Sequence, residues 1–478
     1  MTSPPCTNPN EPEELLDYVS RRVRDPKNPL KLLVIGRAGS GKSTFIKKLL
    51  QRIDGVVETM NLASRNTAAN ETGGQTVFKK FHIDYRNIGK VLEAPCTYYP
   101  KLGLVILDEI SLFYPALVDV LDVLISRMKK KIGQMFGDVH VILVGDFLQL
   151  PADNKNGVPM YKWLGLRKFQ IRMLSTNFRQ AKDGDFCQRL DRWAVGRVTK
   201  DDFDFIKERS VAKNGTTMYE EVAQFYISQN WRAVDCLILT STNKIATNFT
   251  RMVLNARGIH EIVEIDAVVI QVIPDKLDLP VTYKPVETPI GLLLGINAPI
   301  IFTQDTHDES GNKVKKGTVG RITDFEFVEN EIKSISIRIK KGAPLKFRRI
   351  IANSHKVGEA TESLAIFNFR NGISTTFNQA QGRTLKKVMI DTSRGELYPA
   401  QFYTGASRVC CADALHFTYL PEEEMTSLET IINPDRGAIN EHKEWRKRWK
   451  HVELPSDVPI AVQDDKENIP EPDDFFSF

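Results

Sequence analysis

Short apolar runs alternate with helical patterns over the first 175 or so residues of the chain. Three runs predict buried strands, at residues 30–36 (LKLLVIG), 101–109 (KLGLVILDE) and 139–146 (VHVILVGD). None of them alternates strictly between apolar and polar positions, which is typical of parallel strands covered on both faces. Between the last two, residues 115–131 repeat apolar positions at helical spacing and end in basic residues. The pattern predicts an α/β domain built on a parallel sheet.

A second α/β pattern begins at residues 234–243 (VDCLILTSTN) and resumes at residues 386–393 (KKVMIDTS). The stretch between them changes to β-strand patterns, and the isoleucines of KSISIRIKKG alternate so that they share one face. We therefore expect two similar α/β lobes, the second interrupted by a small β-barrel-like insertion, with a nucleotide cleft between the lobes.

This pattern divides the chain into five parts. They are an N-terminal extension (1–29), a first lobe (30–175), a second lobe in two pieces (176–256 and 361–435), the β insertion (257–360) and a C-terminal segment (436–478).

The C-terminal segment combines two patterns. Residues 441–451 (EHKEWRKRWKH) either form a helix with Trp445 and Trp449 on one face or contact nucleic acid, and the i, i+4 spacing favours packing. After Pro455 the sequence is acidic and contains prolines, which predicts disorder. Its last four residues, FFSF behind two aspartates, are a candidate docking peptide for a replication or repair protein.

Composition narrows the class of protein. Of 478 residues, 42% are hydrophobic and 26% charged, as in soluble globular proteins. No apolar run approaches the roughly 18 residues of a membrane span, and the acidic N-terminus resembles neither a secretory nor a mitochondrial signal. The six cysteines form no C-x-x-C pair, so we expect reduced thiols in an intracellular protein, nuclear or cytoplasmic. A net charge of +5 permits a nucleic-acid partner without requiring one.

The stretch LVIGRAGSGKSTF contains the phosphate-loop pattern G-x-x-x-x-G-K-[ST] from Gly36 to Ser43. Glycines let the backbone curl so that its N–H groups face a phosphate at the start of a helix. Lys42 is expected to reach the outer phosphates, and the Ser43 hydroxyl to ligate Mg²⁺. The spacing therefore predicts a site for a nucleoside triphosphate.

Further polar residues follow the other predicted strands. Asp108 is placed to complete the Mg²⁺ shell, and Glu109 to orient or deprotonate the attacking water. Gln149, in VGDFLQLP, carries a neutral amide that can sense the γ-phosphate. Arg179 (STNFRQ) and Arg408 (FYTGASRVC) are candidates to stabilise charge on that phosphate when the cleft closes.

This ordered set, GRAGSGKST, ASRNTAAN…GGQTVFKKF, LDEIS, VGDFLQLP, NFRQ, LTSTN, FNQAQGRTL and QFYTGASRV, resembles the PIF-type (petite integration frequency) DNA helicases of the RecD-like branch of superfamily 1. The motifs run from about residue 32 to 410. The resemblance implies an α/β fold of two RecA-like lobes with an SH3-like insertion in the second. It also implies ATP-driven 5′-to-3′ movement on single-stranded DNA and unwinding of duplex or fork DNA in replication, recombination or repair, with ATP and Mg²⁺ as cofactors.

Residue by residue, the resemblance assigns two sets beside the catalytic Lys42, Asp108, Glu109, Gln149, Arg179 and Arg408. The nucleotide set is Gly36, Ala38, Gly39, Ser40, Gly41, Lys42, Ser43, Thr44, Gln381 and Gly382. The strand-contacting set is Asn66, Thr76, Asn243, Asn378 and Gln379.

The sequence departs from the family pattern at several strand-contacting positions. Ser64-Arg65-Asn66 differ from the usual turn, Phe78 stands at a usual histidine, and Asn378-Gln379 stand at a usual His-Lys pair. The adenine-reading glutamine is not evident in residues 1–30, which leaves the base preference open.

Two other functions compete with this hypothesis. One is a superfamily 1 RNA helicase, which a comparison of ATPase stimulation by DNA and RNA would distinguish. The other is an ATP-gated scaffold that binds a single strand without unwinding, for which a broken hydrolytic set would be expected.

Overall fold

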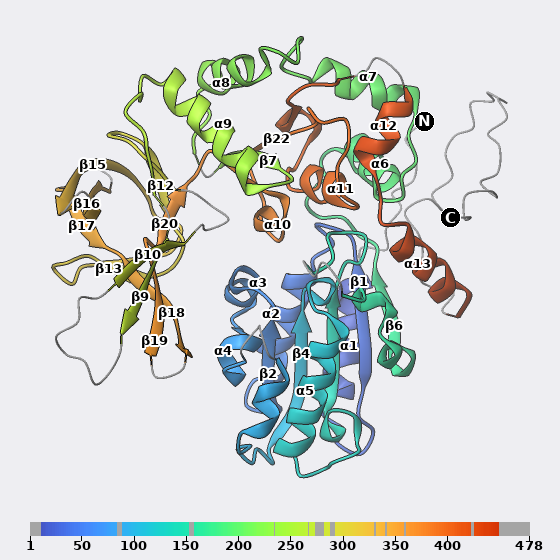
Figure 1. The fold of residues 1–478 in the computed structure, drawn as a ribbon. Coiled ribbons are helices and arrows are strands. Elements are labelled where there is room, and N and C mark those ends of the chain that lie inside the picture. Colours follow the sequence, from blue (N-terminus) through green and yellow to red (C-terminus); the bar gives the residue numbers. More distant parts are fainter. Residues whose placement is uncertain are drawn as a thin grey trace, which may run out of the picture.

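The computed structural model describes residues 11–83, 88–152, 157–233, 235–265, 267–272, 282–286, 292–328, 331–339, 342–357, 360–421 and 425–448. Figure 1 shows a lower α/β lobe, an upper α/β lobe and a β insertion beside them. The C-terminal acidic stretch, Trp449 and the terminal FFSF lie outside the described residues.

The first lobe contains a six-stranded parallel sheet in the order β3-β2-β4-β5-β1-β6. Its strands are β1 (Lys31–Gly36), β2 (Glu58–Ala63), β3 (Gln75–Thr76), β4 (Leu102–Asp108), β5 (His140–Gly145) and β6 (Gln170–Leu174). Its helices are α1 (Glu11–Arg22), α2 (Lys42–Ile53), α3 (Asn66–Thr72), α4 (Val77–Phe81) and α5 (Pro115–Met128), with 3₁₀ turns η1 (Ile88–Glu93), η2 (Ile110–Leu112), η3 (Met135–Asp138), η4 (Met160–Lys162) and η5 (Leu164–Lys168).

Both faces of this sheet are buried, which confirms the prediction from the continuous apolar runs. Leu33 of β1 and Val105 of β4 belong to the core on the α5 side. Their neighbours Leu32 and Leu104 belong to the core shared with α1 and α2. Helix α1, which the sequence assigned to an N-terminal extension, is therefore part of the packing of the first lobe.

The second lobe contains a four-stranded parallel sheet in the order β21-β7-β22-β23. Its strands are β7 (Cys236–Thr240), β21 (Ser374–Thr376), β22 (Lys387–Ile390) and β23 (Leu415–Phe417). The helices in this part of the chain are α6 (Gly184–Ala194), α7 (Lys200–Glu208), α8 (Met218–Ser228), α9 (Asn243–Ala256), α10 (Phe377–Ala380), α11 (Gln401–Ala406) and α12 (Met425–Ile432), with the 3₁₀ turn η6 (Ala412–Ala414).

The β insertion lies between α9 and β21 and is antiparallel. A five-stranded sheet runs β17-β16-β15-β12-β20 and a four-stranded sheet runs β10-β9-β19-β18. The strands are β8 (Val263–Ile265), β9 (Ala267–Val272), β10 (Thr282–Val286), β11 (Leu292–Leu294), β12 (Pro299–Phe302), β13 (Thr306–His307), β14 (Lys313–Val314), β15 (Val319–Val328), β16 (Glu331–Arg338), β17 (Leu345–Arg348), β18 (Ile350–Val357), β19 (Ala360–Ile366) and β20 (Phe369–Asn371).

The insertion continues past the boundary at residue 360 that the sequence predicted. Strand β19 pairs with β9, and β20 pairs with β12. These pairings join residues far apart in the chain, so the local pattern around residue 360 carries no sign of them. The isoleucines of β16 behave as predicted, since Ile335 and Ile337 are fully buried.

Helix α13 (Arg436–Arg448) follows α12 but lies against the first lobe. The Trp445 ring packs on the Phe147 ring with centroids 5.5 Å apart, and the Tyr161 hydroxyl donates to Asp435 over 3.1 Å. The packing role predicted for Trp445 is confirmed.

Two further predictions concern the class of protein. Within the described part of the chain, none of the helices combines the length and apolar character that crossing a membrane requires. The five cysteines of the described ranges are all free thiols.

Candidate nucleotide site between the two lobes

The phosphate loop joins β1 to α2 as the spacing predicts. Gly39 and Gly41 both adopt a left-handed backbone (φ +82°), a conformation that glycine reaches without a steric penalty. A side chain at Gly39 would collide with the Arg179 Cβ, 2.6 Å away. Lys42 is buried, and its ammonium donates to the carbonyl oxygens of Gly36 and Arg37 over 2.7 and 2.8 Å. Burial lowers the pKa of Lys42 below its ordinary value.

The rest of the predicted loop set surrounds this lysine. Ala38 and Ser40 are buried, and the Ser40 hydroxyl has no hydrogen-bond partner among the described residues. Ser43 is partly exposed and Thr44 is exposed at the start of α2. The loop therefore presents a buried cation and accessible hydroxyls at a helix N-terminus.

Two carboxylates meet at the end of β4. Asp108 is buried, and its Oδ1 accepts a hydrogen bond from the Glu109 backbone N–H over 2.9 Å. Burial, followed by the neighbouring Glu109 charge, raises the pKa of Asp108 to about 8. Glu109 has a left-handed backbone (φ 52°), and its buried Oε2 has no partner among the described residues. A strained acidic residue beside a phosphate loop is typical of a catalytic position.

Gln149 connects the two lobes. Its Nε2 donates to Asp146 Oδ2 over 2.8 Å, and its Oε1 accepts from Arg408 Nη2 over 3.0 Å. Arg408 is buried and also donates to the Thr404 carbonyl over 2.7 Å. Burial, with a smaller contribution from the nearby Arg179 charge, lowers the pKa of Arg408 to about 9. A desolvated guanidinium of this kind is well placed to bind an anion.

Arg179 lies between the phosphate loop and the second lobe. Its Nη1 donates to the Ser407 carbonyl over 2.8 Å, next to Arg408. Burial lowers its pKa. The two arginines predicted to act together are thus brought to the same wall of the cleft.

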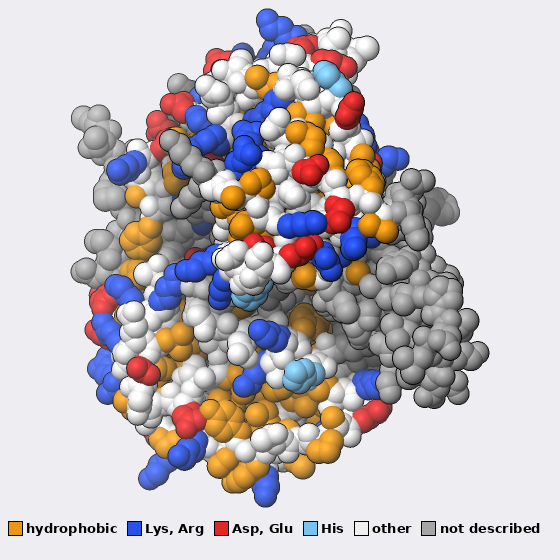
Figure 2. All heavy atoms as spheres, turned by 90° about the vertical axis from the view of Figure 1, so that its left-hand side faces the viewer, with side chains coloured by type: hydrophobic (Ala, Val, Ile, Leu, Met, Phe, Trp, Pro, Cys, Tyr) orange, Lys and Arg blue, Asp and Glu red, His pale blue; other side chains and the backbone are white. Residues whose placement is uncertain are grey.

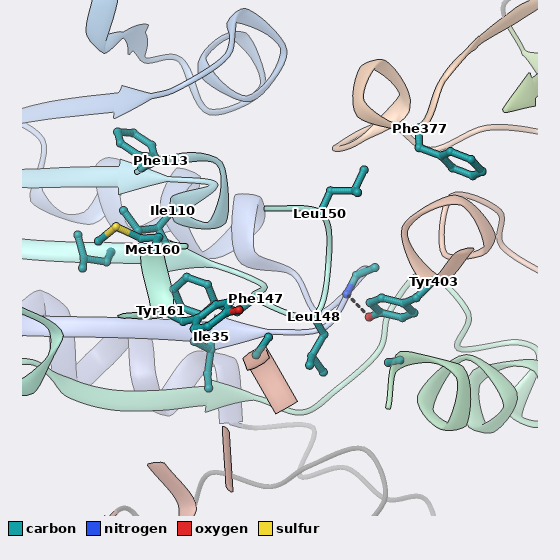
Figure 3. Packing of buried hydrophobic residues seen from close by; sticks show 14 of the residues in the cluster. Ile35, Ile110, Phe113, Phe147, Leu148, Leu150, Met160, Tyr161, Phe377 and Tyr403 are labelled. Carbon is teal, nitrogen blue, oxygen red and sulfur yellow. Dashed lines mark hydrogen bonds between the residues drawn. The ribbon is translucent and has the colours of Figure 1, made fainter. Parts of the chain in front are cut away.

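Further hydrogen bonds connect the two lobes. The Tyr403 hydroxyl of α11 accepts from the Ala38 N–H of the phosphate loop over 3.2 Å, as the dashed line in Figure 3 shows. Thr404 accepts from the Leu150 N–H over 3.1 Å. Figure 3 also shows Phe377 of the second lobe opposite Leu148 and Leu150 of the first lobe. The phosphate loop is therefore in direct contact with the second lobe.

Gln381 and Gly382 follow α10 in the second lobe. Gly382 (φ +82°) faces the cleft, since a Cβ there would lie 3.9 Å from Glu109 Oε1. Gln381 is buried, and neither polar atom of its amide has a partner among the described residues.

Sequence reasoning missed two residues at this site. Phe178 is 53% exposed, and its ring carbons lie 3.3 Å from where a Cβ of Gly41 would be. Tyr403 is fully enclosed. The position of Phe178 directly before Arg179 in the sequence could have marked it as a site residue. The contact that Tyr403 makes with the phosphate loop depends on the docking of the lobes, which the sequence around Tyr403 does not show.

The strand-contacting candidates lie on both lobes. Thr76 is the N-cap of α4, accepting from the Lys79 N–H over 3.2 Å, and Asn243 begins α9. Asn66 begins α3, and its side chain is not among those that the structure describes. Gln379 accepts from Thr375 Oγ1 over 2.7 Å. Arg65 donates to the Asn378 carbonyl, so the α3 and α10 segments touch across the cleft.

The donor set fits a nucleoside triphosphate with Mg²⁺. Ser43 and Asp108 would hold the metal, which binds through one or two protein oxygens together with phosphates. A divalent cation would neutralise the charge of the buried Asp108 carboxylate and of the partly buried Glu109 carboxylate beside it. The Ser40 hydroxyl, which has no partner among the described residues, fits a phosphate oxygen.

Comparison with known proteins points to one family. The sequence profile of the PIF1-like helicases matches residues 10–186. The ATP-dependent DNA helicase PIF1 of Saccharomyces cerevisiae is 29% identical over 198 residues, covering 37% of this chain and 22% of that protein. PIF5 of Trypanosoma brucei brucei is 27% identical over 226 residues, covering 39% and 24%.

Over this region the chain is similar to the PIF1-like helicases.

The PIF1-like fold extends over almost the whole chain. The Bacteroides Pif1 structure with ADP-AlF3 and single-stranded DNA superposes with a TM-score of 0.64 at 22% identity, covering 92% of this chain and 98% of that one. Candida albicans Pif1 gives 0.63 at 18% identity, covering 92% and 99%. These similarities establish the RecA-like fold. The match spans about a quarter of the length of the curated PIF1-like relatives.

Proposed function

We propose that this PIF1-like chain is an ATP-dependent DNA helicase that moves 5′-to-3′ on single-stranded DNA and unwinds duplex. The observation that carries the proposal is the hydrogen bond between Gln149 of the first lobe and Arg408 of the second, beside the phosphate loop. A triphosphate bound at that loop would touch residues from both lobes, so its binding and cleavage would change how the lobes fit together.

Each residue of the site has a separate role in the proposed ATP hydrolysis. Lys42 exchanges its loop carbonyl partners for the outer phosphates. Glu109, whose Oε2 is buried without a partner in the described chain, orients the attacking water and accepts its proton. Arg179 and Arg408 stabilise the charge that develops on the γ-phosphate, which is worth about 10³–10⁵ in rate for an arginine finger. Mg²⁺, held by Ser43 and Asp108, would neutralise phosphate charge.

Coupling to the DNA strand runs through the second lobe. Gly382 lies beside Glu109, and it follows Asn378 and Gln379 of the strand-contacting set closely in the chain. A shift of α10 on hydrolysis would therefore move the strand contacts and the nucleotide contacts together. The complete hydrolytic set favours a motor over an ATP-gated scaffold. An intracellular location, nuclear or cytoplasmic, is part of the same proposal.

A strand-displacement assay tests the proposal. With ATP, the protein is expected to displace the labelled strand of a duplex that bears a 5′ single-stranded overhang and to leave a 3′-overhang duplex intact, with Lys42→Ala inactive on both. Activity on the 3′-overhang substrate alone would reject the assigned direction. Equal ATPase rates with and without a DNA oligonucleotide would reject the motor, and stimulation by RNA alone would place the chain among RNA helicases.

A further inference from the structure

A buried ion pair joins the phosphate loop to helix α6. Arg37, the second residue of the loop, donates from Nη1 to Asp191 Oδ2 of that helix, and both side chains are buried. Arg37 thus differs from the Lys and Arg side chains that lie on the surface of the molecule in Figure 2. Removing one partner of such a pair leaves an uncompensated buried charge, so the contact is strongly favoured while both residues stay in place.

Helix α6 packs as part of the second lobe. Its Trp193 ring lies edge-on to the Phe402 ring of α11, with centroids 5.1 Å apart. Its N-cap residue, Asp183, accepts from the Ala412 N–H of η6 over 2.9 Å. The carboxylate of the ion pair therefore moves with the second lobe, whereas its guanidinium moves with the phosphate loop of the first.

Arg37 is also part of the contact that holds Lys42. Its carbonyl oxygen accepts from the Lys42 ammonium over 2.8 Å and from the Ser40 N–H over 3.1 Å. The next residue, Ala38, donates from its N–H to the Tyr403 hydroxyl of the second lobe over 3.2 Å. The part of the loop that holds Lys42 before a triphosphate arrives is therefore the part that contacts the second lobe.

The ion pair favours closed lobes without fixing them. Arg37 Nε is buried and has no hydrogen-bond partner among the described residues. A buried donor without a partner costs free energy, and separation of the lobes would give water access to this donor and to both charges. The pair is therefore a contact that the lobes can open and close.

We propose that Arg37 and Asp191 are positioning residues that favour the closed cleft and so increase the preference of the site for a nucleoside triphosphate over a diphosphate. The inference rests on the proposed function, in which Arg179 and Arg408 bind the γ-phosphate across the cleft. A triphosphate contacts both lobes, whereas a diphosphate lacks the group that reaches the second lobe. Only a ligand that binds the closed state more tightly gains affinity when that state is favoured.

Asp191→Asn tests this role, because it removes the charge with little change in shape. Titration calorimetry without DNA measures the binding of ADP and of adenylyl imidodiphosphate, a non-hydrolysable ATP analogue, both with Mg²⁺. The Kd of the analogue is expected to rise about 10–100-fold, as for the loss of a hydrogen bond between charged groups, while the Kd of ADP stays within about twofold. A pair that only shaped the phosphate loop would weaken both nucleotides equally.

Two further variants serve as controls. Arg37→Met/Asp191→Leu replaces both charges by apolar side chains, which a buried site often tolerates, so the affinity for the analogue should return to within about threefold of the parent. Asp201→Asn breaks the surface ion pair that Arg189 of α6 makes over 2.7 Å. It should leave both affinities unchanged.

The outcomes separate this inference from the proposed function. Equal losses for the two nucleotides in Asp191→Asn, or the same loss in Asp201→Asn, would overturn the positioning role, and so would a double variant that stays weak. Should Asp191→Asn not fold, Arg37→Met takes its place with the same expected difference between the nucleotides. If the parent shows that difference from Asp191→Asn but its ATPase does not respond to DNA, the helicase function fails and the positioning role stands.

Discussion

The Arg408 guanidinium donates from Nη2 to the Gln149 Oε1 over 3.0 Å, and the same amide donates to Asp146 over 2.8 Å. Gln149 is therefore fixed by a partner from each lobe, and it is almost fully buried. In the proposed mechanism this amide transmits the state of the triphosphate from one lobe to the other.

Gln149→Ala should lower DNA-stimulated ATPase by roughly 10–100-fold, since a hydrogen bond to a charged group contributes about 1.5–3 kcal/mol. Basal ATPase should fall less, because the phosphate loop is unchanged. Steady-state rates with and without DNA measure both values. Gln170→Ala, whose amide accepts from Tyr18 on the far edge of the sheet, is the matched control and should behave as the parent.

Lys42→Ala should abolish DNA-stimulated ATPase and leave single-strand affinity within about twofold, because the lysine ammonium is buried and donates to two carbonyl groups of the phosphate loop. Lys48→Ala changes an exposed lysine of the same helix, paired with Glu13, and should keep full activity. Retention of ATPase by Lys42→Ala would contradict the assignment of the loop.

The Phe178 ring is exposed and lies beside Gly41. We expect this ring to stack on the nucleotide base, so Phe178→Ala should raise the KM for ATP about tenfold with little change in kcat. Stacking contributes about 1–3 kcal/mol and tolerates any base. The KM for GTP should therefore rise by a similar factor, and Phe178→Tyr should restore both. A change in kcat alone would speak against stacking.

His442 predicts a dependence of stability on pH. Burial lowers its pKa from 6.5 to about 4, with Asp146 acting weakly in the opposite direction. The unfolded chain binds this proton more readily, so the stabilisation is present above pH 6.5 and is lost as the pH falls towards 4. The loss is of the order of 3 kcal/mol.

Urea unfolding at several pH values measures this effect. His140 and His416 have pKa values lowered in the same way, to about 4, so His442→Leu should reduce the acid loss rather than remove it. An unchanged pH profile in His442→Leu would contradict the prediction.

The sequence predicted the parts of this molecule that depend on neighbouring residues. The strands around Leu33 and Val105 are continuous apolar runs, and the phosphate loop is a contiguous motif. Both could therefore be predicted from residues that are adjacent in the chain. The structure also brings Gln149, Arg179 and Arg408 to one cleft, as their order in the motifs predicted.

What the sequence did not predict depends on pairing between distant segments. The extension of the insertion to Asn371 requires β20 to find β12, about 70 residues earlier. Tyr403 reaches the phosphate loop only because the lobes dock.

Helix α13 has a mechanical consequence. It leaves the second lobe and is anchored to the first by Trp445 on Phe147 and by Asp435 on Tyr161. Phe147 lies two residues from Gln149. In the proposed mechanism the helix would therefore act as a tether between the lobes, and the movement in each ATP cycle would be limited by contacts that lie outside the nucleotide site.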